Sequence, residues 1–211
     1  MSRKLPPIKL SSKILIICEG SEEYDYLNRL INCSIWCNIY SIKLKNAKSL
    51  DKIYPLYQYH YNNSNYDLIL IFCDTEMSPY SQFLNLKSKI NEFHNNKSSE
   101  KVVLFVNPCT MQLILSHFAD VCLTSNQKNI NSKIIKQLTG IDDYKATEKQ
   151  RESLMNKINS NNYKTMIQNA SKIKLEFTNI PSTNIVPIFK NLETDKTTWI
   201  NDINKKIETE K

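Results

Sequence analysis

Three acidic residues follow two apolar runs of the sequence at equivalent points. Glu19 comes directly after residues 13–18, and Asp74 and Glu76 come at the end of the apolar run 67–73. Carboxylates that lie within a few ångströms of one another repel unless a cation sits between them. Hard oxygen ligands select Mg²⁺, Mn²⁺ or Ca²⁺, and such an ion polarises a phosphodiester and supports an attacking water. The three acids therefore predict a Mg²⁺ (or Mn²⁺) site suited to phosphodiester chemistry.

The same acids have a simpler interpretation. An acid after a strand can cap the next helix and face water, and this explains Glu19 alone or Asp74 alone. Their placement at equivalent ends of two buried strands favours a shared site instead. Asp74 and Glu76 are two residues apart, so in an extended chain their side chains point to the same side.

The elements that must position these acids are predicted from apolar patterning. Short continuous apolar runs are typical of strands buried on both faces of a parallel sheet, and strand and helix alternate through the first 120 or so residues. This alternation predicts an α/β fold with a mostly parallel central sheet flanked by helices, in which ligands bind outside the carboxyl ends of the strands. The expected strands cover residues 13–18, 35–44, 67–73 and 101–106, and the expected helices cover 22–31, 50–61, 79–93, 109–119, 129–139, 147–159 and 163–175, with one more helix capped by Thr183.

The composition suggests three parts to the chain. Residues 1–11 are expected to be a flexible N-terminal segment, residues 12–125 an α/β domain, and residues 126–211 a mainly helical C-terminal extension packed on it. The last fifteen residues are charged and are expected to fray.

Charge and composition restrict the class of protein. Lys and Arg outnumber Asp and Glu by 28 to 21, and a net charge of +7 favours a polyanionic partner such as nucleic acid. The abundance of Asn, Lys and Ile, with only two glycines, also fits the bias of AT-rich coding. Six cysteines without a C-x-x-C pair indicate a reducing compartment. Without a signal peptide or an apolar run of about 18 residues, we expect a soluble cytoplasmic protein with no membrane partner.

Four motifs resemble those of RloB-like proteins in the Toprim (topoisomerase–primase) superfamily. Ile-Cys-Glu-Gly-Ser-Glu-Glu at 17–23 resembles the first acidic motif of Toprim domains, and Phe-Cys-Asp-Thr-Glu at 72–76 resembles the second, which is normally Asp-x-Asp. Asn-Pro-Cys at 107–109 with His-Phe at 117–118 resembles a segment of RloB-like proteins. Pro-Ser-Thr-Asn at 181–184 is similar to the segment before that family's closing helix. The shared order makes the combination more specific than each motif alone.

The resemblance implies a Toprim fold related to the OLD-family nucleases, and a Mg²⁺-dependent nuclease acting in bacterial anti-phage defence or abortive infection. It assigns Glu19 as general acid/base and metal ligand, and Asp74 and Glu76 as metal ligands. Some RloB-like proteins are encoded beside an ATPase, which implies an ABC- or AAA-type ATPase partner besides DNA or RNA. A homo-oligomer is a further alternative for the assembly of this protein.

Four further residues are candidates for support of the site or for phosphate contact: Glu23, Asn107, His117 and Lys145. His117 lies on an apolar helix, so a buried structural role stays open for it. Asn107 can form a turn, and Lys145 can be a solvated lysine. Met111 stands where the family commonly has an acid, which puts one metal ligand in doubt.

Three functions remain open from the sequence. The first is a metal-dependent nuclease, and the second is a non-catalytic Toprim-like module that binds nucleic acid or a partner ATPase as a sensor or scaffold. The third is a flavodoxin-like or Rossmann-like enzyme for a small molecule. The chain's only glycines, Gly20 and Gly140, provide no glycine-rich phosphate loop for that third function.

Overall fold

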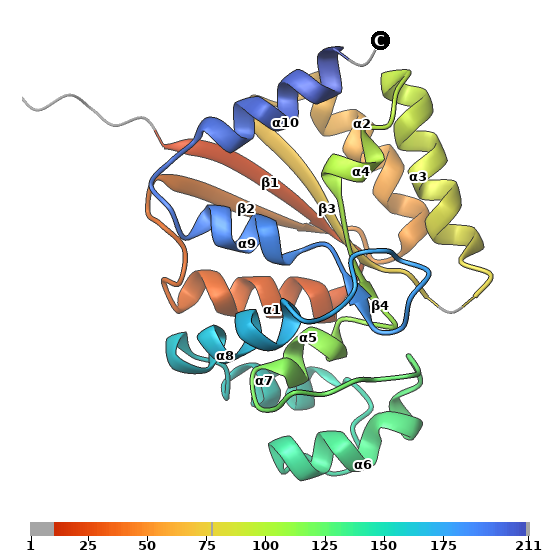
Figure 1. Cartoon of the computed structure of the whole chain (residues 1–211), viewed down its shortest axis with the longest axis vertical. Helices are drawn as coiled ribbons and strands as arrows, with labels where there is room; N and C mark the ends of the chain where they lie inside the picture. Colours follow the sequence, from red (N-terminus) through yellow and green to blue (C-terminus); the bar gives the residue numbers. More distant parts are fainter. Residues whose placement is uncertain (1–10, 77, 210–211) are drawn as a thin grey trace, which may run out of the picture.

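The fold is built on one five-stranded sheet with the order β2-β1-β3-β4-β5. Figure 1 labels the four parallel strands of this sheet, β2, β1, β3 and β4. The computed structural model describes residues 11–76 and 78–209, so the flexible segment expected at residues 1–11 lies almost wholly outside the described residues. The first four strands are parallel and the last is antiparallel: β1 (Ser12–Cys18), β2 (Tyr40–Asn46), β3 (Leu68–Asp74), β4 (Val103–Asn107) and β5 (Ser182–Thr183). The expected mostly parallel α/β sheet is confirmed.

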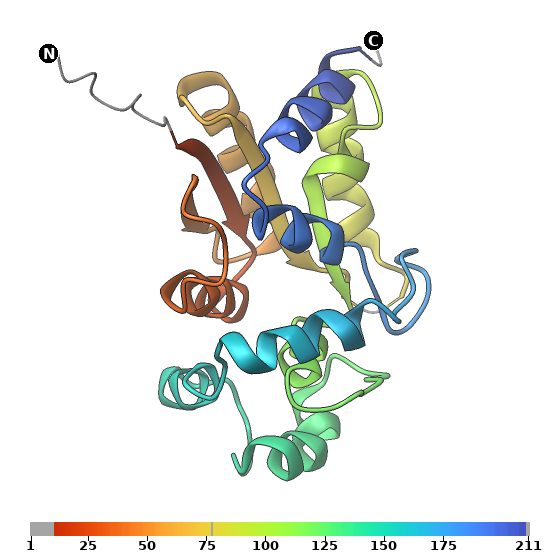
Figure 2. The same cartoon turned by 60° about the vertical axis from the view of Figure 1, so that its left-hand side comes forward.

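Helices cover both faces of this sheet and both ends of its strands (Figures 1 and 2). One face carries α1 (Ser21–Asn32) and α9 (Val186–Leu192), and the other carries α2 (Ile53–Asn63) and α3 (Ser81–His94). A third group lies beyond the carboxyl ends: α5 (Met111–Ser116), α6 (Lys128–Thr139), α7 (Glu148–Met155) and α8 (Ser160–Ala170). Two short helices, η1 (Leu50–Lys52) and α4 (Ser99–Val102), precede α2 and β4.

Alternate strand residues enter two separate cores. In β1, Ile14 and Ile16 belong to the core on the α1 side, whereas Leu15 and Ile17 belong to the core on the α2 side. Successive side chains of a strand point to opposite faces, and burying each aliphatic side chain contributes about 1.5–3 kcal/mol. This arrangement explains why the strands read as continuous apolar runs.

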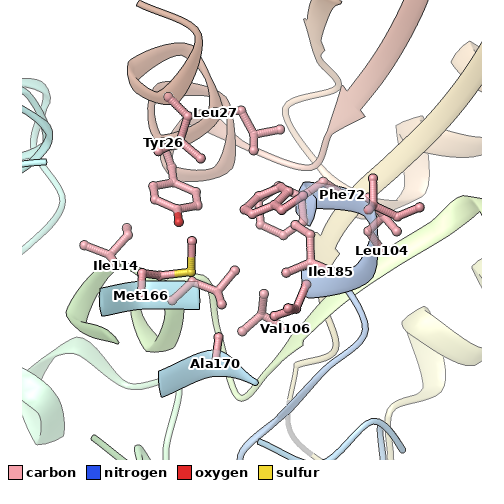
Figure 3. Packing of buried hydrophobic residues seen from close by; sticks show 14 of the residues in the cluster. Tyr26, Leu27, Phe72, Leu104, Val106, Ile114, Met166, Ala170 and Ile185 are labelled. Carbon is pink, nitrogen blue, oxygen red and sulfur yellow. The ribbon is translucent and has the colours of Figure 1, made fainter. Parts of the chain in front are cut away.

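The core on the α1 side joins the sheet to the helices beyond its carboxyl edge. Figure 3 shows Tyr26 of α1 close to Ile114 of α5 and Met166 of α8, with Phe72 of β3 and Ile185 nearby. All five side chains are buried. Residues from both halves of the chain therefore share one core. In the described parts of the chain, no helix combines the length and apolarity needed to cross a membrane.

The predicted helix cap at Thr183 is wrong. Thr183 lies in β5, where its Oγ1 donates to the carbonyl oxygen of Phe105 at 2.7 Å and its N–H donates to Lys174 at 2.8 Å. Helix α9 begins only at Val186, with a proline in its first turn. Partners that are distant in the sequence draw Thr183 into the sheet, and no local pattern encodes them.

The strand expected at residues 35–44 begins later, at Tyr40. The helix expected at residues 50–61 consists of η1 followed by α2. Pro55 lies in the first turn of α2, where a backbone N–H would have no partner within the helix.

The C-terminal segment is also better ordered than expected. Residues Thr198–Thr209 form α10, which passes the amino ends of the strands, where Asn204 Nδ2 donates to the carbonyl oxygen of Asp67 at 2.8 Å. Trp199, Ile200 and Ile207 are buried against the rest of the molecule. For the described residues of this segment the prediction of fraying is wrong, because three apolar side chains among the charges anchor the helix, whereas residues 210 and 211 lie outside the described residues.

We therefore expect Trp199→Ala to lower the free energy of unfolding by about 3–5 kcal/mol, the usual result of removing a buried Trp side chain. The Trp199 side chain is 8 % exposed, and its Nε1–H donates to the Tyr40 hydroxyl at 3.0 Å. Urea unfolding followed by circular dichroism measures the change. Asn201→Ala, at an exposed position of the same helix, serves as the control and should change the value by less than about 0.5 kcal/mol. Equal effects of the two substitutions would contradict the packing of α10.

Candidate functional site

The carboxyl ends of β1 and β3 bring Glu19 and Asp74 together. The parallel register pairs Cys18 with Phe72, and the N–H of Glu19 donates to the carbonyl oxygen of Phe72 at 3.0 Å. The Glu19 carboxylate then accepts the backbone N–H of Asp74, with Oε2 at 3.1 Å. The expectation that the two strand ends lie side by side is confirmed.

This contact lies where the order of the sheet changes direction. From β1 the chain proceeds to β2 on one side, and then returns to β3 on the other side. Helices that leave neighbouring strands toward opposite faces open a crevice between them, and ligands of open α/β sheets bind in it. The position of the acids is therefore that of a ligand site.

Asp74 is fixed by Thr110, which the sequence analysis did not single out. Asp74 Oδ1 accepts both the backbone N–H of Thr110 at 2.7 Å and its Oγ1–H at 2.8 Å. Thr110 is completely buried between β4 and α5. Because both bonds go to Oδ1, the other oxygen, Oδ2, is left for a further partner. The only signal in the sequence was the position of Thr110 directly after the Asn-Pro-Cys motif.

Glu23 is the third buried acid of the site. It lies in the first turn of α1, and its Oε2 accepts the N–H of Gly20 at 2.9 Å. A Cβ added to Gly20 would stand 3.2 Å from that oxygen, so glycine permits the close turn. The turn holds Glu23 beside Glu19 and Asp74.

Burial and mutual repulsion make these acids hard to ionise. Burial, followed by the charge of Glu23, raises the pKa of Glu19 to about 8. Burial and then the charges of Glu23 and Glu19 raise the pKa of Asp74 well above its usual range. Burial and the charge of Glu22 also raise the pKa of Glu23. A cation among these carboxylates would cancel their mutual repulsion and offset the cost of burying their charges.

The acids open into a cleft of about 300 Å³. Its walls come from the turns after β1 and β2, from the start of α5 and from the α6–α7 segment. The lining residues are Glu19, Gly20, Ser21, Glu22, Glu23, Lys48, Ser49, Asp74, Cys109, Met111, Asn126, Lys128, Asn131, Ile135, Ala146 and Arg151.

Two polar contacts hold the α6–α7 segment against α1. The Tyr144 hydroxyl donates to Glu22 Oε1 at 2.6 Å, and Arg151 Nε donates to Asp25 Oδ2 at 2.6 Å. The cleft therefore has one wall built on the sheet and one wall tethered to it through α1.

The donor atoms suit a divalent metal ion, although the side chains do not form a closed metal cage. Within residues 11–76 and 78–209, no group of three or more His, Cys, Asp or Glu side chains is arranged to hold a metal ion. Mg²⁺ usually binds through one or two carboxylates together with waters and substrate phosphates. Glu19 and Asp74, adjacent and open to the cleft, fit this sparse type of site.

Glu76 lies apart from the other two predicted ligands. It follows β3 with a left-handed φ of 61°, its side chain is exposed, and it is not among the residues that line the cleft. Its charge still contributes to the raised pKa of Glu19. The structure thus brings Glu19 and Asp74 together and leaves Glu76 at the periphery.

Asn107 points away from the cleft. Its Nδ2 donates to the carbonyl oxygens of Phe177 at 2.6 Å and Asn179 at 3.0 Å, and its Oδ1 is buried without a hydrogen-bond partner among the described residues. Asn107 therefore holds the 177–179 loop against β4.

Lys145 is exposed and its Nζ forms an ion pair with Asp143 at 2.6 Å. It lines a neighbouring hollow rather than the acidic cleft. This placement agrees with the interpretation of Lys145 as a solvated lysine.

His117 is a buried structural residue. Its Nδ1 lies 3.1 Å from Asn162 Oδ1, and its Nε2 lies 3.0 Å from the Tyr26 hydroxyl. Because the amide oxygen can only accept, Nδ1 carries the proton and Nε2 accepts from Tyr26. Burial lowers the pKa of His117 to about 4, so the ring is neutral near neutral pH.

The cations of the cleft, Lys48, Lys128 and Arg151, were not predicted from the sequence. Lys48 follows β2, whereas the other two come from the segment after residue 125. Their types and spacing carry no motif, because the packing of α6 and α7 beyond the sheet brings them there.

Comparison with known proteins adds no relative: no protein-family model, curated protein or solved structure matches the chain. The geometry and the sequence motifs are therefore the basis for the function proposed below.

The buried His117 predicts a pH dependence of stability. Between pH values of about 6.5 and about 4, the unfolded chain binds a proton at His117 that the folded protein excludes, so stability falls as the pH falls through this window. The loss attributable to this residue is about 3 kcal/mol at most. The neighbouring Tyr26 and Tyr163 stay neutral in this window, because burial raises the pKa of each.

Chemical unfolding of the wild type and His117→Gln from pH 7 to pH 4 measures this loss. The variant is less stable at pH 7, and its deficit should shrink as the pH falls, since glutamine does not titrate. The carboxylates are common to both proteins, so their titration cancels in the difference. A deficit that is independent of pH would show that His117 is not excluded from protonation.

Proposed function

We propose that this chain is a Toprim-like, RloB-like nuclease that hydrolyses phosphodiester bonds of DNA or RNA with Mg²⁺ or Mn²⁺. The observation that carries the proposal is the 3.1 Å contact between the Glu19 carboxylate and the N–H of Asp74 at adjacent strand ends, inside an open cleft. The motif order 17–23, 72–76, 107–109 and 181–184 supports the same family.

Each acid has a distinct part in this chemistry. Asp74 is the better-anchored ligand, because Thr110 fixes Oδ1 through two hydrogen bonds and leaves Oδ2 for the ion. Glu19 uses Oε2 to accept the N–H of Asp74 and keeps Oε1 to take a proton from water. Glu23 adds negative charge beside Glu19 and Asp74. When bound, the divalent ion would supply Lewis-acid polarisation of the phosphate.

Partner and biological setting are proposed from the resemblance alone. RloB-like proteins imply a role in anti-phage defence or abortive infection, with an ABC- or AAA-type ATPase as a candidate partner. The six free cysteines support a cytoplasmic location. A net charge of +7 supports a nucleic-acid substrate.

A second function is a non-catalytic Toprim-like module that binds nucleic acid or an ATPase partner. Met111 favours it, because this apolar side chain lines the cleft where the resembled family commonly has an acid. The two proposals differ in whether the cleft catalyses cleavage or only serves a protein that binds a partner.

Metal binding is the first test of the proposal. Saturating Mn²⁺ should raise the unfolding free energy of the wild type by about 3 kcal/mol at one hundred times the dissociation constant. Asp74→Asn should abolish this gain, because the amide oxygen still accepts from Thr110 while the charge is lost. Glu100→Gln, which removes an exposed acid outside the cleft, should leave the gain unchanged. Calorimetric titration measures the binding of Mn²⁺ to each protein, and thermal unfolding measures the gain in stability.

Cleavage of mixed DNA and RNA substrates in Mn²⁺ then separates the two functions. The nuclease proposal expects cleavage that Glu19→Gln and Asp74→Asn each reduce by more than about a hundredfold, as removal of a catalytic group does. Metal binding without cleavage of any substrate would support the binding module instead. A wild type that neither binds the ion nor cuts would overturn the nuclease proposal, and nucleic-acid or ATPase binding by such a protein that Asp74→Ala leaves unchanged would support the binding module.

A further inference from the structure

Two lysines stand at the edge of the acidic cleft without a counter-ion. Lys48 follows β2 and Lys128 begins α6, and both line the cleft with exposed side chains. Neither ammonium group forms a hydrogen bond or ion pair with any residue in the described parts of the chain. The third cation, Arg151, differs because Asp25 holds it at 2.6 Å. The cleft thus combines buried acids with two uncompensated positive charges.

A second hollow lies beside the cleft. This hollow, of about 510 Å³, shares Asn126 and Lys128 with the cleft and runs past Gln127 and Asn129. These neighbours carry side-chain amides, which donate to phosphate and sugar oxygens as well as accept from them. The start of α6, with Lys128, therefore borders both hollows and offers polar groups to a chain-like ligand that extends from one to the other.

The dimensions of the cleft favour a thin ligand. Its volume of about 300 Å³ is at the lower end of the range for small-molecule pockets, which suits a group the size of one nucleotide. A duplex, whose major groove alone is about 12 Å wide, does not fit into such a space. A single strand can therefore enter the cleft beside the acids, whereas a duplex can only lie across its mouth.

We infer that a single nucleic-acid strand runs through this cleft, and that Lys48 and Lys128 contact the phosphates flanking the one at Glu19 and Asp74. A lysine ammonium is a mobile point charge with three donors, which suits phosphate oxygens in several orientations. The inference rests on the proposed nuclease function. It adds the form of the substrate and the two residues that hold it.

Lys48 offers an unusually informative substitution. Its φ of 73° is left-handed, and its N–H donates to Asn46 Oδ1 at 2.7 Å. Asparagine adopts this conformation more readily than lysine does. Lys48→Asn therefore removes the charge while relieving the backbone, and its melting temperature should equal or exceed that of the wild type. A loss of binding in this variant cannot be attributed to unfolding.

The test is the salt dependence of binding to a labelled single-stranded oligonucleotide in Ca²⁺, which takes the same oxygen ligands as Mg²⁺. Each phosphate contact contributes about 0.7 to the slope of log K against log salt for single strands. Lys48→Asn and Lys128→Gln should each lower the slope by about 0.7, and the double variant by about 1.4. Lys133→Gln, on the same helix but outside the cleft, loses the same charge and should leave the slope unchanged.

The outcomes distinguish this inference from the proposed function. If the wild type binds and cuts while the two cleft variants match Lys133→Gln, the lysine contacts are overturned and the nuclease stands. If the wild type binds no oligonucleotide with any divalent ion, the nuclease proposal falls, and this inference with it. A duplex closed by hairpins at both ends should bind about tenfold more weakly than the single strand, since it must first open. Equal affinity for the two forms would overturn the single-strand assignment.

Discussion

The hydrogen bond from the Asp74 N–H to the Glu19 carboxylate is the contact on which the candidate site depends. It exists because β1 and β3 are parallel neighbours, so their carboxyl ends reach the same edge of the sheet. A carboxylate at that edge leaves the apolar core but remains largely surrounded by protein. Burial and repulsion then raise the pKa of Glu19 and Asp74 together. Folding thus builds an arrangement of acids that is unfavourable alone and favourable around a cation, as in functional sites that sacrifice stability.

The two walls of the cleft are held by different physical interactions. The sheet wall rests on the two cores that sandwich the strands, and Thr110 fixes Asp74 from a completely buried position. The other wall shares one of these cores through Ile135, Tyr144 and Leu154, and adds two polar ties to α1, the Tyr144–Glu22 hydrogen bond and the Arg151–Asp25 ion pair. Local stability follows the number of buried apolar contacts. The acids are therefore placed by the strands and their cores, while Lys128 is carried by a helix that is attached through Ile135 to one of these cores.

Local patterning in the sequence was sufficient for the strands that carry the acids, because a strand buried on both faces must be apolar throughout. Parallel pairing then placed Glu19 beside Asp74 without any structural information. The same reasoning failed for Thr183, whose place in β5 depends on Phe105 far away in the sequence. It also failed for α10, where a few buried side chains outweigh a charged composition. Thr110, Lys48 and Lys128 could not be identified, because turn geometry and helix packing decide their positions.

The net charge and the local charge of the molecule have opposite implications for a polyanion. A net charge of +7 attracts nucleic acid over a distance of about 10 Å at ordinary salt concentration. Inside the cleft, however, a phosphate meets Glu19, Glu23 and Asp74, and the ionised forms of these acids carry charge of its own sign. Lys48 and Lys128 lie at the edge and balance only part of it. A divalent ion between the acids and the phosphate removes the conflict, because it neutralises both sides at once. Under the proposed function, the cleft would be complementary to a phosphodiester only as a complex with such an ion, and the net positive charge of the chain and the buried acids would then act together.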